Sequence, residues 1–173
     1  MEPVPFHFGI VTDDLGASMR DLSRSLGVTW TEPGSGGLLF HGVDGRAQPQ
    51  PVSCISREGP IHMDLIQGSP DSIWAAPDGP RLHHFAYWTD DLVGDIERLA
   101  IDGWRLELTN PDGEGHPTVF AYLVRADGFR VELIDAAGKA AYAQRLATDS
   151  PGELPRFFHH NDEVTNADSV RAI

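Results

Sequence analysis

The sequence predicts an α+β fold in which two tandem βαβββ modules make up one domain, and two observations support this prediction. The first is an internal repeat: HFGIVTDDL starts at His7, and a matching HFAYWTDDL starts at His84. The second is that each copy continues with an amphipathic stretch, a glycine and three β-like runs. Each half therefore follows the order strand, helix, strand, strand, strand.

The first module is expected to span residues 4–67 and to begin with a strand at His7. The Thr-Asp-Asp segment after this strand offers side-chain oxygens that cap a helix over Leu15–Leu26, and Gly27 is a typical residue to end that helix. The remaining β-like runs of this module lie at residues 28–31, 52–56 and 61–67.

The second module is expected to span residues 82–135, with its own Thr-Asp-Asp cap before a helix over Leu92–Ile101. Gly103 follows this helix as Gly27 follows the first one. A linker rich in proline and glycine, residues 68–81, joins the two modules.

Other segments lie outside the repeated pattern. Gly34 to Pro51 is extra sequence in the first module, of which residues 38–40 are expected to prolong a strand while the rest forms a loop. A C-terminal helix over residues 136–148 completes a single domain of residues 1–148. Residues 149–173 are polar and acidic, so we expect a solvated tail there.

Composition narrows the possible functions. Thirteen Lys and Arg residues stand against 26 Asp and Glu residues, and the resulting formal charge of −13 argues against binding to nucleic acid. No window approaches about 18 uninterrupted apolar residues, so no membrane-spanning helix is expected. The N-terminus lacks the basic and apolar regions of a signal peptide, which predicts a cytoplasmic protein. A single Cys excludes an internal disulfide and a Cys-rich zinc site.

Two histidines and two carboxylates occupy matching places in the two copies. His7 and His84 begin the first strands, and Asp64 and Glu132 each precede Leu-Ile in the last strands. If a pseudo-twofold axis relates the modules, these four side chains converge as two symmetric pairs. Two imidazoles and two carboxylates suit one divalent ion (Zn, Ni, Co, Mn or Fe) with a position left open for substrate. The alternative is a vestigial repeat that binds no ion.

These motifs resemble the vicinal oxygen chelate (VOC) superfamily, which includes glyoxalase I, methylmalonyl-CoA epimerase, extradiol dioxygenases and the bleomycin resistance proteins. The resemblance covers residues 6–135 and rests on HFGIVTDDL, HMDLIQ, HHFAYWTDDL and GFRVELID. It implies half-barrel sheets that form a cup around a metal ion, with the helices outside. It places the family's metal ligands at His7, Asp64, His84 and Glu132. The second of these is usually Glu or Gln, so the shorter aspartate is an alternative that binds through water.

The four-ligand set favours a glyoxalase- or epimerase-like lyase or isomerase, which moves a proton next to a metal-held carbonyl of a small-molecule substrate. An Fe(II) extradiol-type dioxygenase is one alternative, because such enzymes resemble the chain at His, His and Glu alone. A non-catalytic small-molecule-binding or antibiotic-resistance protein of the same fold is another. Uncovered edges of the half-barrel sheets favour a homodimer.

Strand alternation adds two catalytic candidates. Glu132 is expected to act as a base as well as a ligand, so that Glu132→Gln abolishes proton exchange while some metal is retained. His62 lies two residues before Asp64 and shares its face. It is interpreted either as a proton carrier or as a hydrogen-bonded strand histidine.

The same alternation suggests substrate contacts. Arg130 lies two residues before the second carboxylate, where it either clamps a substrate carboxylate or phosphate or forms an ion pair with an acid. Trp88 and Val11 share the faces of the two predicted histidine ligands and are expected to wall the cup. His83, which directly precedes His84, is expected to face the opposite side.

Overall fold

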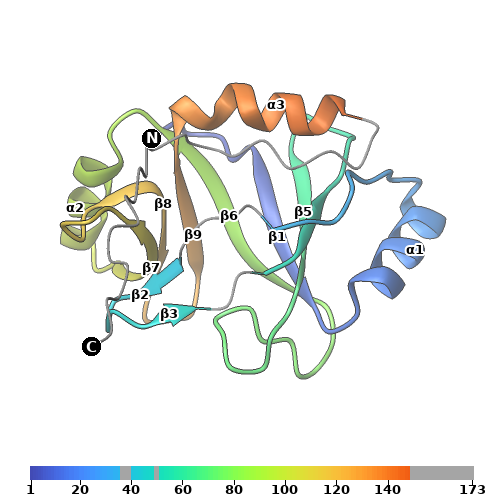
Figure 1. The fold of residues 1–173 in the computed structure, drawn as a ribbon, viewed down its shortest axis with the longest axis horizontal. Coiled ribbons are helices and arrows are strands. Elements are labelled where there is room, and N and C mark those ends of the chain that lie inside the picture. Colours follow the sequence, from blue (N-terminus) through green and yellow to red (C-terminus); the bar gives the residue numbers. More distant parts are fainter. Residues whose placement is uncertain (36–39, 49–50, 149–173) are drawn as a thin grey trace, which may run out of the picture.

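Residues 1–35, 40–48 and 51–148 are described by the computed structural model shown in Figure 1. The first module contributes β1 (His7–Thr12), α1 (Leu15–Leu26), β2 (Phe40–Gly42), β3 (Ala47–Gln48), β4 (Ser53–Ile55) and β5 (His62–Gln67). The second contributes β6 (Arg81–Thr89), α2 (Leu92–Ile101), β7 (Arg105–Pro111), β8 (Pro117–Val124) and β9 (Arg130–Asp135). A 3-10 turn, η1 (Ala136–Gly138), and α3 (Lys139–Ala147) follow. The predicted tail, residues 149–173, lies outside the described residues.

The strands form one curled, mixed sheet, a half-barrel in the order β3-β2-β7-β8-β9-β6-β1-β5-β4 (Figure 1). In each module the first strand runs parallel to the last, since β1 pairs with β5 and β6 pairs with β9. The antiparallel pair of β1 and β6 joins the two modules. The predicted α+β half-barrel is therefore confirmed, and equivalent residues of the repeat face each other across the central strand pair.

Aspartates of the repeated Thr-Asp-Asp segment cap both predicted helices. The side chain of Asp14 accepts a hydrogen bond from the backbone N–H of Ala17 at 2.8 Å, and that of Asp91 accepts one from Gly94 at 3.0 Å. Gly27 ends α1 with a φ of 74°, which glycine adopts without strain.

The α1 and α2 helices cover the outer face of the sheet. Leu15 of α1 packs with Leu65 of β5, and Leu99 of α2 packs with Leu123 of β8 and Leu133 of β9. Because successive strand residues point to opposite faces, the residues directly before and after each of these strand leucines face the interior of the half-barrel.

The α3 helix lies against the inner side of the sheet, unlike the two outer helices. Tyr142 of α3 belongs to an apolar cluster with Ile55 of β4 and Trp88 of β6. Phe6 stacks on the Trp88 ring at 3.9 Å between centroids in the same cluster. This helix therefore contributes side chains to the interior of the half-barrel.

The extra sequence of the first module contains more strand than predicted. Residues 40–48 fold as the hairpin β2–β3, and β2 pairs with β7 of the second module. Phe40 packs on Trp74 and Phe120 at centroid distances of 5.4 and 4.9 Å, so apolar burial holds the hairpin against the other module. The hairpin also covers the edge of β7. Residues 38 and 39 of the predicted strand lie outside the described residues.

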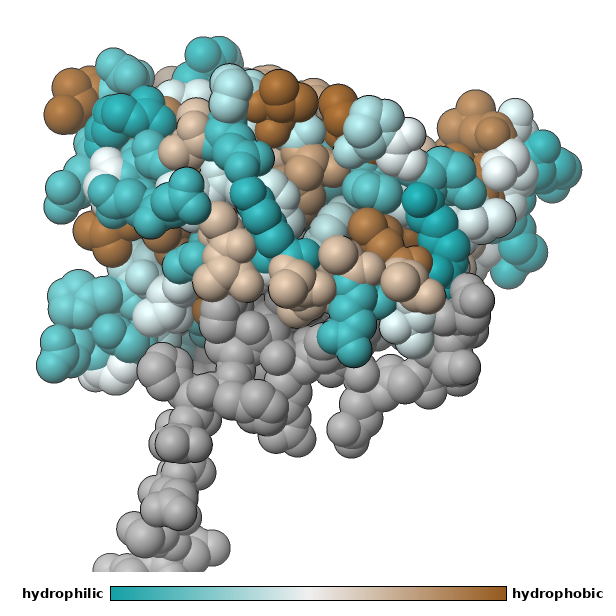
Figure 2. All heavy atoms as spheres, turned by 90° about the horizontal axis from the view of Figure 1, so that it is seen from above, coloured by the Kyte–Doolittle hydropathy of each residue, from teal (hydrophilic) through white to brown (hydrophobic). Residues whose placement is uncertain are grey.

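On the coloured part of the face shown in Figure 2, polar side chains predominate and hydrophobic residues are scattered among them. Single exposed hydrophobic residues of this kind are ordinary on folded domains. None of the helices in the described residues is long and apolar enough to cross a membrane.

Asp95 of α2 gives the fold a pH-sensitive contact. Its carboxylate accepts hydrogen bonds from Thr89 at 2.5 Å, from Arg98 at 2.9 and 3.1 Å, and from the N-terminal ammonium at 2.6 Å. Burial by itself raises the pKa of Asp95, but these bonds outweigh it and lower the pKa to about 2. A folded pKa below the unfolded value means that the stabilisation is complete above the unfolded pKa, near 3.9, and is lost as the pH falls toward 2.

We expect Asp95→Asn to lower the free energy of unfolding of the chelator-treated protein by about 2 kcal/mol at pH 7 and by about 1 kcal/mol at pH 3. Urea melts of both proteins at the two pH values measure this difference. The same loss at both pH values would contradict the assignment, because a lowered native pKa requires a smaller contribution at pH 3, where the unfolded chain already binds the proton.

Candidate metal centre

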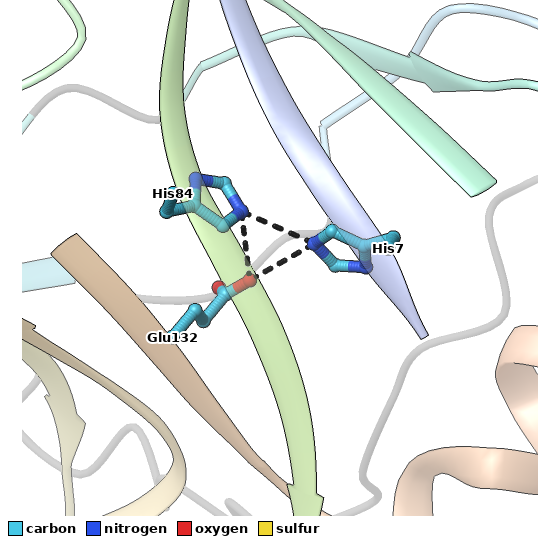
Figure 3. A group of neighbouring side chains, drawn as sticks. All are labelled: His7, His84 and Glu132. Carbon is cyan, nitrogen blue, oxygen red and sulfur yellow. Dashed lines mark hydrogen bonds and ion pairs between the residues drawn. The ribbon is translucent and has the colours of Figure 1, made fainter. Parts of the chain in front are cut away.

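Three side chains from three strands bring their ligand atoms together on the inner face of the sheet (Figure 3). The Nε2 atoms of His7 and His84 lie 3.1 Å apart, and Oε2 of Glu132 lies 3.2 Å from the first and 3.3 Å from the second. All three residues are buried. In the described ranges they are the one group of His, Cys, Asp and Glu residues whose three ligand atoms all lie within 4.8 Å of one another.

The strand register explains this convergence. His7 of β1 is opposite Ala86 of β6, which is in turn opposite Glu132 of β9. His7 and Glu132 therefore lie in one row across three strands. The small side chain of Ala86 between them leaves room for the two ligand side chains to meet. His84 lies two residues before Ala86 and shares its face.

Gly9 makes room for the ring of His84. The two residues are opposite each other in the β1/β6 register. A Cβ atom placed on Gly9 would lie 2.1 Å from Cε1 and 2.4 Å from Nδ1 of the imidazole, far inside van der Waals contact. The His84 side chain has no exposed surface, so this position requires a residue without a side chain.

A β-bulge turns the ring of His83 toward its neighbour, which corrects the expectation that it faces away. Gly9 pairs with His84, but the residue after Gly9 pairs with Leu82, so the register skips His83. The Nδ1 atoms of the two histidines lie 2.9 Å apart, and Nε2 of His83 donates a hydrogen bond to the carbonyl of Ile73 at 2.9 Å. Burial, followed by the charge of His84, lowers the pKa of His83 to about 2.

These contacts determine the tautomer of His84. His83 is neutral and carries its proton on Nε2, because a carbonyl oxygen only accepts, so its Nδ1 is the acceptor. His84 must then carry a proton on Nδ1. In its neutral form Nε2 has a lone pair for a metal ion, and Nε2 donates to Glu132 only when both ring nitrogens are protonated. Histidines that bind a metal through one nitrogen usually donate a hydrogen bond from the other, and His84 has this arrangement.

The donor set fits a divalent metal ion. Burial by itself raises the pKa of Glu132, but hydrogen bonds with His7 and then His84 outweigh it and hold the pKa below its usual range, so the carboxylate is ionised. Two imidazole nitrogens and one carboxylate oxygen suit zinc and the neighbouring transition metals. Ligand atoms about 2.1 Å from an ion in tetrahedral or octahedral coordination lie about 3.0–3.4 Å apart. The separations of 3.1, 3.2 and 3.3 Å fall in this range.

A cavity of about 130 Å³ adjoins the cluster, with His7 and Glu132 in its wall and aromatic rings around them. Five buried side-chain polar atoms lack a hydrogen-bond partner in the part of the chain that the structure describes, and all belong to residues of this wall. They are His7 Nδ1, Asp64 Oδ1, Trp74 Nε1, Tyr142 Oη and Arg145 Nε. Folded proteins rarely leave buried polar groups unpaired, so their concentration here points to a polar ligand in the cavity.

Asp64 lines the same cavity from β5 but does not belong to the three-residue cluster. Its charge contributes to the raised pKa values of two tyrosines in the cavity wall. Burial and then the charges of Glu132 and Asp64 raise the pKa of Tyr122 well above its ordinary value. Burial and then the charge of Asp64 do the same for Tyr142. The predicted four-ligand set is therefore arranged as three converging residues and one separate carboxylate.

Two further predicted site residues have structural contacts. His62 donates a hydrogen bond from Nδ1 to the carbonyl of Ser56 at 2.7 Å and does not line the cavity, which favours its interpretation as a strand histidine. Arg130 forms a two-pronged ion pair with Glu107, at 2.6 and 2.9 Å, outside the cavity. Its guanidinium is thus already engaged, as the ion-pair alternative required.

The two predicted wall residues differ in placement. Trp88 lines the cavity as expected. Val11 has no exposed surface and packs in an apolar core with Ile66 and Leu108, beyond the cavity. Val11 lies four residues after His7 on the same strand face, so the shared face continues past the end of the cavity.

The polar residues of the cavity wall that were not predicted include Tyr122, Tyr142 and Arg145. Tyr122 is opposite Glu132 in the β8/β9 register, so the alternation of β8 contains the signal that places it on this face. Tyr142 and Arg145 are three residues apart and therefore share one face of α3. Their position depends on where α3 docks, which no local pattern of that helix specifies.

A protein-family model described as the Glyoxalase/Bleomycin resistance protein/Dioxygenase superfamily matches residues 6–122, more than half of the chain. The chain belongs to this superfamily. The resemblance to the VOC superfamily, drawn from the repeated motifs, is thereby confirmed. A comparison with curated proteins found no match.

Solved structures with the same fold include other VOC proteins. A methylmalonyl-CoA epimerase variant from Streptomyces coelicolor, in complex with 2-nitronate-propionyl-CoA, has 19% identity, a TM-score of 0.52, and coverage of 77% of this chain and 96% of its own. Methylmalonyl-CoA epimerase from Mycobacterium tuberculosis has 19% identity, a TM-score of 0.53, and coverage of 82% and 97%. A 4-hydroxymandelate synthase variant from S. coelicolor has 20% identity, a TM-score of 0.52, and coverage of 76% and 38%. At these identities the likeness establishes the fold.

Proposed function

We propose that this VOC protein is a divalent-metal-dependent lyase or isomerase that moves a proton at a carbon next to a carbonyl group of a small molecule. The observation that supports the proposal is the convergence of His7, His84 and Glu132 beside a cavity that also contains the unpaired carboxylate of Asp64. Such a pairing of a metal centre with a separate carboxylate suits proton abstraction next to a carbonyl.

Each residue of the site has a separate task in this proposal. His7, His84 and Glu132 hold the ion, and His83 fixes the ring of His84. A divalent ion in this place would supply Lewis acidity toward the carbonyl oxygen, which makes the neighbouring C–H bond more acidic. Asp64 takes the proton from that carbon and returns it, either to the other face of the same carbon or to its neighbour.

The assignment of the base differs from the sequence-based prediction, which chose Glu132. Glu132 lies within 3.3 Å of both imidazoles, so its lone pairs are directed at the ion. Asp64 has an oxygen with no partner in the described residues and borders the same space. A carboxylate that is not shared with the ion is the better proton acceptor, because coordination withdraws electron density from its oxygens.

An oxygen-activating Fe(II) enzyme is the second candidate, and one observation favours it. Among the described residues, two histidines and one carboxylate converge without a fourth ligand, which is the facial triad of many non-haem Fe(II) oxygenases. The two candidates differ in the metal that supports activity and in the need for oxygen.

Solvent deuterium exchange tests the first candidate. Chelator-treated protein is reloaded with Zn²⁺, Ni²⁺, Co²⁺, Mn²⁺ or, without air, Fe²⁺, and is incubated in D₂O with 2-oxo compounds and acyl-CoA thioesters. We expect exchange of the proton next to the carbonyl in at least one class, at least 100-fold above metal ion alone in buffer. His84→Ala is the matched negative control, because it removes one of the three converging ligands.

Two results would contradict the proposal. Oxygen consumption that depends on Fe²⁺, without proton exchange under any metal, would assign the protein to the second candidate. Failure to retain any of these ions would remove the basis of both candidates and favour a non-catalytic binding protein of this fold.

A further inference from the structure

Arg145 is a buried cation with no carboxylate partner among the described residues. It lies on α3, its relative exposure is 9%, and it lines the cavity next to the metal centre. One Nη2 contact, to the carbonyl of Ser53 at 2.9 Å, holds the guanidinium in place. Its Nε–H has no acceptor in the described part of the chain. Buried arginine is normally paired, so an unpaired one in a cavity wall points to a ligand that supplies the anion.

The charges around the cavity support this interpretation. Glu132 and Asp64 together offset the two positive charges of a divalent ion in the centre. Arg145 then remains as one uncompensated positive charge in the same wall. A ligand with one negative charge would neutralise the site, whereas a neutral ligand would leave a buried cation without a counter-ion.

The geometry of the wall places the two ends of such a ligand apart. His7 and Glu132 come from the sheet, on β1 and β9, and Arg145 comes from α3, which packs over β4 and β6 through Tyr142. The rest of the wall is largely aromatic and apolar, as at Trp88, and also includes the polar residues Ser53 and Asp64. An oxygen at one end would face the metal centre while an anionic group at the other end meets the guanidinium.

We propose that Arg145 binds the carboxylate of the substrate, so that the substrate class is a small oxo acid whose carboxylate is separated by a short apolar chain from the carbonyl group that faces the metal centre. The position of the carbonyl group in this inference rests on the proposed function. The position of the carboxylate rests on Arg145 alone. A guanidinium donates two parallel hydrogen bonds to a carboxylate, and the unpaired Nε–H is one of the donors available for such a pair. The hydroxyl of Tyr142, also without a partner in the described residues, adds a neutral donor beside it.

Calorimetric titration of the protein equilibrated with Zn²⁺ tests the inference by binding alone, without turnover, because the charge balance of the cavity includes the ion. The probes are 4-oxopentanoate and 5-oxohexanoate, each compared with its neutral amide, which has the same shape and lacks the charge. We expect both acids to bind more tightly than their amides. Arg145→Gln should weaken acid binding by about 10- to 100-fold and leave amide binding unchanged. Arg145→Lys keeps the charge but loses the paired N–H donors of the guanidinium. Its acid affinity should therefore lie between those of wild-type and Arg145→Gln.

The control is Arg24→Gln, which removes the same charge from an exposed position of α1. It should leave all four titrations unchanged. Melting temperatures of the metal-free variants, together with unchanged amide binding, distinguish a lost contact from a lost fold. Equal acid affinity for wild-type and Arg145→Gln, or no acid binding to wild-type in the millimolar range, would overturn the inference.

The failure of this inference and that of the proposed function can be told apart. Arg145-dependent acid binding with no proton exchange under any metal would keep the anion site and remove the proposed chemistry. Proton exchange in acyl-CoA thioesters that is insensitive to Arg145→Gln would keep the chemistry and remove the oxo acid as its substrate.

Discussion

Replacing Gly9 with alanine is expected to disrupt the metal centre although Gly9 binds nothing itself. The new Cβ would lie 2.1 Å from Cε1 of His84. The imidazole cannot turn aside at low cost, because its Nδ1 is bonded to His83 and its side chain is fully buried. We therefore expect metal affinity to fall by about 10- to 100-fold and the free energy of unfolding to fall by about 1–3 kcal/mol.

Competition with a chromophoric chelator measures the metal affinity, and urea melts of the metal-free protein measure stability. Gly113→Ala is the matched control, since a Cβ there would meet no atom within 4 Å, and it should leave both quantities unchanged. Metal binding of wild-type strength in Gly9→Ala would show that the ring position of His84 is unimportant for the centre.

The repeat accounts for the part of the site that could be predicted. His7 and His84 occupy the same place in each copy, and a parallel pairing of first and last strands in each module brings Glu132 to the same row. These positions can be predicted because the alternation of strand residues and the internal repeat are both visible in the sequence. Together they determine which strand residues share a face.

The rest of the site depends on contacts that such patterns do not specify. The approach of His84 to Gly9 follows from the register between two strands far apart in sequence, and the orientation of His83 follows from a bulge. Arg145 reaches the cavity only because α3 docks on the inner side of the sheet, which the composition of a short helix does not determine. The separation of Asp64 from the cluster depends on the length of one side chain.

Because Asp64 is separate from the three converging ligands, Asp64→Asn is expected to abolish most of the proton exchange without removing the metal. If Asp64 is the base, the amide cannot accept the proton and exchange should fall by about 100- to 10,000-fold. Metal content should remain near one ion per chain, because the three converging ligands are untouched. The stability of the metal-free protein should not decrease, since the substitution removes a partly buried charge with one buried, unpaired oxygen.

Glu132→Gln provides the contrast, because its carboxylate lies within 3.3 Å of both imidazoles. We expect it to lose most of its metal, and with it the exchange, whereas Asp64→Asn loses the exchange alone. Asp90→Asn, at an exposed position after β6, makes the same chemical change away from the cavity and should alter neither quantity. Metal analysis and deuterium exchange on all three variants decide the roles. Loss of metal from Asp64→Asn would make Asp64 a fourth ligand, directly or through water, and return the role of base to Glu132.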